Sequence, residues 1–126
     1  MEQEPQVIHR EERRKHTRYK VKEGTLAFLE ATPCVIVDIS ESGMAVNYVA
    51  FKDECIANYN FDLFSTDRDT YLPRISGELV AEIALVPPSL FSVIHTKRLG
   101  IKFNTLSLDQ QSLLRYFIVQ SAAGTV

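Results

Sequence analysis

The chain has 126 residues, of which 45% are hydrophobic and 24% are charged, and its formal net charge is −2. This length and composition predict one soluble globular domain with a single core. The chain starts with a polar segment and contains no apolar stretch near the roughly 18 residues of a membrane-spanning helix. We therefore expect a cytoplasmic protein with no membrane partner.

The first 22 residues are expected to form a flexible basic arm. Residues 9–22 hold seven basic and two acidic residues, or +5, whereas the rest of the chain holds seven basic and 14 acidic residues, or −7. The arm has few bulky apolar side chains, so burial cannot offset an ordering cost of ~1–2 kcal/mol per residue. We expect residues 1–22 to attract an anionic ligand and residues 23–126 to form the folded domain.

Six β-strands are predicted after Gly24. Their expected ranges are 25–30, 34–39, 44–50, 57–64, 74–86 and 95–104. The second is rich in β-branched residues, and the fourth alternates polar and apolar residues. Residues 40–43 carry a turn signal, so the second and third strands should form a tight hairpin, while residues 65–71 should form a loop. The internal Gly77 indicates a bend or bulge in the fifth strand.

One helix is predicted at the C-terminal end. Ser107 and Gln110 fit a capping box at its start, and it should end near residues 122–124. Its expected apolar stripe consists of Leu113, Leu114, Phe117 and Ile118. The predicted fold is all-β with one helix: a six-stranded antiparallel barrel, closed or nearly closed, with the C-terminal α-helix packed on it.

Two polar motifs carry the candidate chemistry. The first, here called the arm motif, is Arg14-x-x-x-Arg18, with Arg13 directly before it. The second, here called the turn motif, is Asp38-x-Ser40-x-x-Gly43, at the end of the second strand and in the turn after it. About one strand separates the two motifs, so the start of a barrel could bring them to the same rim.

The residue types of these motifs suit a guanine nucleotide. A guanidinium matches the O6/N7 edge of guanine bidentately and also pairs with phosphate. The Asp38 carboxylate only accepts hydrogen bonds, so it suits the donor edge, N1–H and N2–H₂. The Ser40 hydroxyl can donate or accept, and Gly43 lets backbone and ligand approach closely.

Each motif also has a purely structural interpretation. A segment this basic contains Arg-x-x-x-Arg spacings by composition alone and could be a solvated charge run. Asp38 and Ser40 could be ordinary turn formers, and Gly43 could be the turn residue that adopts a positive φ. The two motifs together, in this order and context, are more specific than either alone.

The segments RRKHTRYKV and VIVDISESGMAV resemble the PilZ domain, the bacterial receptor for cyclic di-GMP, and GIKF followed by a short helix is similar to that family's C-terminal end. The resemblance covers residues 12–122 and implies a six-stranded barrel with the arginine arm wrapped over the ligand. It implies that Arg14 and Arg18 hold phosphates and guanine edges. Asp38, Ser40 and Gly43 would surround one guanine. In that family an arginine at the Arg13 position accompanies two stacked ligand molecules, so we expect a stacked dimer.

The predicted function is a cyclic di-GMP receptor that signals to an unidentified downstream protein, with no enzymatic activity and no cofactor. A PilZ-like adaptor that binds protein and no nucleotide is the alternative. A single-stranded nucleic-acid barrel is disfavoured because the body is acidic and the arm has a single aromatic residue, Tyr19.

Other chemistry is disfavoured by the local sequence. A triad of Asp38, Ser40 and His95 lacks the first glycine of a nucleophile elbow. The segment around Asp67 and Asp69 has too few ligands for calcium. Cys34 and Cys55 sit among apolar neighbours, so we interpret them as reduced core thiols, and no zinc site is expected.

Overall fold

The computed structural model describes residues 16–51, 56, 58–65, 70–85 and 94–126. In this part of the chain the elements, in order, are β1 (Tyr19–Val21), β2 (Thr25–Leu29), β3 (Thr32–Ile39), β4 (Gly43–Phe51), β5 (Tyr59–Ser65), β6 (Thr70–Ala84), β7 (Ile94–Phe103), α2 (Leu108–Ser121) and β8 (Ala122–Thr125).

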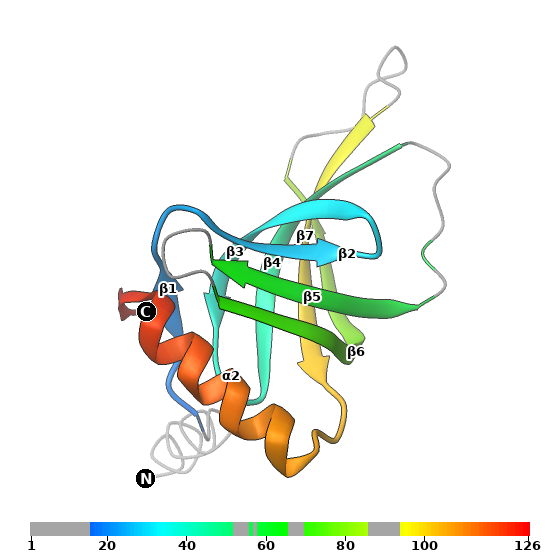
Figure 1. The fold of residues 1–126 in the computed structure, drawn as a ribbon. Coiled ribbons are helices and arrows are strands. Elements are labelled where there is room, and N and C mark those ends of the chain that lie inside the picture. Colours follow the sequence, from blue (N-terminus) through cyan, green and yellow to red (C-terminus); the bar gives the residue numbers. More distant parts are fainter. Residues whose placement is uncertain (1–15, 52–55, 57, 66–69, 86–93) are drawn as a thin grey trace, which may run out of the picture.

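Six of these strands close into a barrel (Figure 1). The hydrogen-bonded order is β2-β5-β6-β7-β4-β3, and β3 pairs back with β2 to complete the ring. Every pairing around the ring is antiparallel. The closed ring and the C-terminal helix α2 packed beside it confirm the predicted fold class.

Strands β1 and β8 extend the barrel at one edge of β3. The first half of β3 pairs with β2, and its last residue, Ile39, pairs with Tyr19 of β1. Strand β8 then pairs with β1 (Figure 1). The sequence did not predict β8, and it placed β1 inside the basic arm. Residues 1–15 of that arm lie outside the described residues, so the division of the chain at residue 22 stays a prediction.

Strand β6 differs from its prediction in two ways. It begins at Thr70, within the segment predicted to be a loop. Its irregularities lie on either side of Gly77: the register with β7 shifts between Leu79 and Ala81, and Arg74 has a φ of 59°. The prediction that the irregularity lies at Gly77 itself was therefore wrong. Gly77 is needed because a Cβ there would lie 2.9 Å from the carbonyl oxygen of Lys102.

Helix α2 closes part of the core. Leu114, Phe117 and Ile118 are buried, at spacings that place them on one face. Leu113 is 48% exposed, so its inclusion in the predicted stripe was wrong, because one residue turns the side chain by about 100° around the helix. The capping box is confirmed: the Gln110 backbone N–H donates to Ser107 Oγ at 3.1 Å, and the Ser107 N–H donates to Gln110 Oε1 at 3.0 Å.

The barrel interior holds Cys34, which is buried as predicted and whose thiol donates a long hydrogen bond to the Thr32 carbonyl oxygen. Burial raises the pKa of the Cys34 thiol to about 11. Cys55 lies outside the described residues. Within the described ranges no helix is long and apolar enough to span a bilayer, and no three His, Cys, Asp or Glu side chains gather as metal ligands would.

Candidate ligand-binding site

The turn motif lies at the β3–β4 hairpin, where the strand pairing is irregular. The register between β3 and β4 shifts between Ile36 and Asp38, which makes a bulge at Val37. After this bulge the burial pattern loses its alternation, and both Asp38 and Ile39 are buried. A carboxylate is thus held in a largely buried position at the end of a strand, where burial is costly unless a partner compensates.

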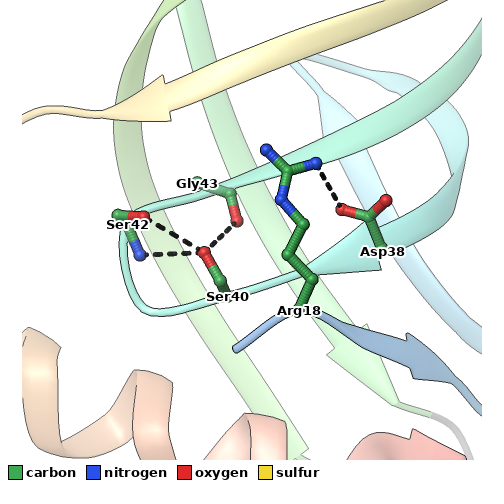
Figure 2. A network of polar contacts seen from close by, with 5 residues as sticks. All are labelled: Arg18, Asp38, Ser40, Ser42 and Gly43. Carbon is green, nitrogen blue, oxygen red and sulfur yellow. Dashed lines mark hydrogen bonds and ion pairs between the residues drawn. The ribbon is translucent and has the colours of Figure 1, made fainter. Parts of the chain in front are cut away.

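Arg18 supplies that partner. Its Nη1 atom lies 3.4 Å from Oδ1 of Asp38, and the two side chains are 45% and 12% exposed, respectively (Figure 2). Arg18 directly precedes β1, and β1 pairs with the last residue of β3. The pairing of β1 with β3 therefore places Arg18, the second arginine of the arm motif, next to Asp38, the first residue of the turn motif.

The Ser40 hydroxyl is part of the turn itself. Its oxygen accepts a hydrogen bond from the Ser42 backbone N–H at 3.2 Å, and the hydroxyl donates to the Gly43 carbonyl oxygen at 3.3 Å (Figure 2). The Ser40 N–H also donates to that carbonyl, at 2.8 Å. The predicted turn-forming role of Ser40 is thus observed, and it leaves the hydroxyl at the edge of a hollow.

Gly43 is required by the neighbouring strand. The interpretation that Gly43 is needed for a positive φ was wrong. Among the described glycines, those with positive φ are Gly24 and Gly124. A Cβ at Gly43 would overlap the carbonyl oxygen of Ile101 in β7. The Phe103 N–H donates to the Ser42 carbonyl oxygen at 2.8 Å, which holds β7 against the turn.

A hollow of about 440 Å³ opens beside this turn. Its size is within the ~300–1,000 Å³ of typical small-molecule pockets. Its lining residues are His16, Arg18, Ser40, Ser42, Gly43, Val80, Ile101 and Lys102. The hollow therefore combines two basic side chains, two hydroxyls and an apolar wall, which suits a flat, anionic ligand.

Two solved structures are similar in fold. One is the PilZ domain of YcgR from Escherichia coli, solved with cyclic di-GMP: the identity is 14%, the match covers 86% of this chain and 90% of that one, and the TM-score is 0.63. The chain has a PilZ-like fold. The other is MrkH, described as a cyclic di-GMP-dependent transcription regulatory factor, with 16% identity over 85% of this chain, 50% of that chain and a TM-score of 0.54. No protein-family model and no curated protein matches this sequence.

In this PilZ-like barrel, four of the six candidate residues are described, and the structure brings them together. Arg18, Ser40 and Gly43 line the hollow, and Asp38 holds Arg18 from beside it. Arg13 and Arg14 lie outside the described residues, so their roles stay predictions.

Lys102 was not predicted as a site residue. Strand alternation alone places it outward, between the buried Ile101 and Phe103. Its position beside Gly43, however, depends on the β4–β7 register, which the local sequence does not specify.

Proposed function

We propose that this chain is a cytoplasmic, non-enzymatic receptor for cyclic di-GMP. The observation that carries the proposal is the contact between Arg18 and Asp38 at the edge of a hollow that Ser40 and Gly43 also line. These groups supply what a guanine nucleotide needs: a cationic fork for phosphate or the O6/N7 edge, and a carboxylate acceptor for the donor edge. The PilZ domain of YcgR, similar in fold, was solved with this ligand.

In the proposed mechanism the part of the basic arm that precedes β1 closes over the ligand. Arg14 and Arg18 contact phosphates and guanine edges, and Asp38, Ser40 and Gly43 surround one guanine. Ordering about five arm residues costs ~5–10 kcal/mol. Two arginines alone offset such a cost poorly, so Arg13 takes part, and the ligand binds as a stacked dimer with more phosphates to contact.

The output of the receptor is a new surface made of arm, ligand and barrel, which a downstream protein recognises. The free energy for this change comes from tighter binding of the ligand to the ordered arm than to the free one. No enzymatic step, nucleic acid or membrane is part of the mechanism.

Isothermal titration calorimetry with cyclic di-GMP tests the proposal, and cyclic di-AMP tests base selectivity. We expect saturable binding near two ligands per chain and a clear preference for guanine. Arg14→Ala and Asp38→Ala should each weaken binding at least about tenfold, since a hydrogen bond to a charged group contributes ~1.5–3 kcal/mol. Lys20→Ala is the control, because Lys20 is exposed on β1 and does not line the hollow.

A folded protein that produces no heat with cyclic di-GMP would contradict the receptor and favour the protein adaptor. Unchanged affinity in both Arg14→Ala and Asp38→Ala would show that the ligand binds elsewhere. A ratio of one ligand per chain would contradict the stacked dimer and leave the receptor standing.

A further inference from the structure

Lys102 occupies the outer face of the barrel, next to the turn motif. It lies in β7 between two buried residues, and its own side chain is exposed. Its direct neighbour on β4 is Gly43, and its direct neighbour on β6 is Glu78. Because Gly43 has no side chain, this neighbour on β4 does not compete with the lysine stem for space.

Lys102 also stands where two hollows meet. It lines the 440 Å³ hollow that contains Arg18, and it lines a second hollow of about 280 Å³ that reaches Gln111 and Arg115 of α2. Ser42 and His16 line both hollows as well. A ligand in the first hollow therefore has both Arg18 and Lys102 among the residues around it.

The Lys102 ammonium is not neutralised by a carboxylate in the part of the chain that the structure describes. The ion pairs there are Arg18–Asp38, Lys97–Glu82 and Arg115–Glu41. Lys97, on the same strand, meets Glu82 at 3.0 Å, whereas Lys102 and Glu78 stand opposite each other without such a contact. Arg18 pairs with Asp38, so among the described residues that line the hollow Lys102 is the basic side chain without a carboxylate partner.

We propose that Lys102 binds a phosphate of the dinucleotide and is thus a third cationic contact, outside both motifs. The inference rests on the proposed function and extends its site onto β7. Lysine acts as a compact point charge with three donors, which fits a phosphate oxygen, whereas the planar fork of arginine fits the guanine edge. Lys102 therefore supplies affinity without base selectivity, whereas the arginines contact both phosphates and guanine edges and Asp38 contacts the base.

Lys102→Ala and Lys102→Gln test the assignment by calorimetry with cyclic di-GMP at several salt concentrations. We expect each variant to bind roughly tenfold to a hundredfold more weakly, since a charge-assisted hydrogen bond is lost. The plot of log affinity against log salt should become shallower, because the variant lacks an ion pair that added salt screens. Lys102→Arg should retain most of the affinity.

Lys97→Ala is the matched control. It removes the same charge from the same strand, but its ammonium is engaged by Glu82, so affinity and salt slope should stay as in the unaltered chain. Thermal unfolding of each variant checks the fold, and Lys102→Arg separates loss of charge from loss of packing.

Three results would overturn the inference. The first is unchanged affinity in Lys102→Ala while the unaltered chain binds. The second is lost affinity with an unchanged salt slope, which would assign Lys102 to an uncharged part of the ligand. The third is an equal loss in Lys97→Ala, which would indicate a general charge effect. If the unaltered chain itself does not bind, the proposed function fails, and the inference fails with it.

Discussion

The guanidinium of Arg18 contacts the carboxylate of Asp38, with 3.4 Å between Nη1 and Oδ1. The two motifs are therefore in direct contact, although 20 residues separate them in the sequence. The distance exceeds the ~2.7–2.9 Å of a strong charge-assisted hydrogen bond. Arginine has five N–H donors and this contact engages one, so the others can reach a ligand while Asp38 orients the group.

Arg18→Ala is expected to affect binding much more than folding. Asp38 is only 12% exposed, but Arg18 is 45% exposed, so water can reach the carboxylate when the guanidinium is removed, and we expect a loss near the upper end of the ~0–1 kcal/mol of a surface pair. The affinity for cyclic di-GMP should fall at least about tenfold, and Arg18→Lys should recover part of it, since it restores the charge but not the fork. Urea unfolding and calorimetry on the same samples measure the two effects.

The opposite pattern would contradict the assignment. Should Arg18→Ala lose several kcal/mol of stability and still bind with full affinity, the residue would be a structural partner of Asp38 only. Lys20→Ala again controls for the loss of one charge in this region of the chain.

Gly43→Ala is expected to destabilise the barrel because of the close approach of β7. A Cβ at this position would overlap the Ile101 carbonyl oxygen, which is backbone and cannot rotate away. Such overpacking costs about 1–3 kcal/mol, and the shift of the turn should weaken ligand binding as well. Urea unfolding gives the change in the free energy of unfolding.

Gly100→Ala provides the comparison for Gly43→Ala on the facing strand. A Cβ at Gly100 would lie 3.1 Å from the Cβ of Ala81, a contact that a small local shift relieves. We expect Gly100→Ala to cost less than Gly43→Ala. A reversed order would mean that the β4–β7 spacing at the turn is wider than described.

Local signals in the sequence predicted the parts of the fold that local chemistry determines. The β3–β4 hairpin has β-branched strands flanking a Ser-Gly turn, and the capping box at Ser107 satisfies backbone groups within one helical turn. Strand β8 was missed because three of its four residues, in AAGT, are Ala or Gly, which are depleted in strands. It forms because β1 offers an open edge next to the end of α2.

In the candidate site, too, some residues could be predicted from local sequence, whereas others depend on how distant strands pair. Arg18, Asp38, Ser40 and Gly43 could be found because they belong to motifs within single segments. Lys102 could not, because its place beside Gly43 comes from the pairing of β4 with β7, strands more than 40 residues apart in the chain. The sequence also could not show that Gly43 accommodates Ile101, a contact across the same two strands.

Cys34 is expected to be an inert thiol in the folded protein. Burial raises its pKa from an ordinary 9.0 to about 11, so the reactive thiolate is scarce at neutral pH. In a Cys55→Ser background, a thiol reagent should modify Cys34 slowly under native conditions and rapidly in urea. Equal rates in the two conditions would contradict the burial of Cys34 in the barrel.

The same pKa shift predicts how Cys34 affects stability at alkaline pH. The unfolded thiol ionises near 9 and the folded one near 11, so between these values the folded chain holds more protons than the unfolded chain. The contribution of Cys34 is thus full below pH 9 and declines as the pH rises toward 11. Urea unfolding at pH 7.5, 9 and 10 should show the advantage over Cys34→Ala shrinking; a constant difference would contradict the shift.

The ion pair between Glu41 and Arg115 links the turn motif to helix α2. Arg115 Nε donates to Glu41 Oε1 at 2.9 Å, and both side chains are exposed, at 60% and 42%. A double-mutant cycle with Glu41→Gln and Arg115→Gln should give a coupling energy of only ~0.2–1 kcal/mol, which decreases with added salt. If the turn and the helix move together when the ligand binds, the coupling measured with cyclic di-GMP present should differ from the coupling without it. Identical couplings in both conditions would show that the pair holds the helix to the turn without responding to the ligand.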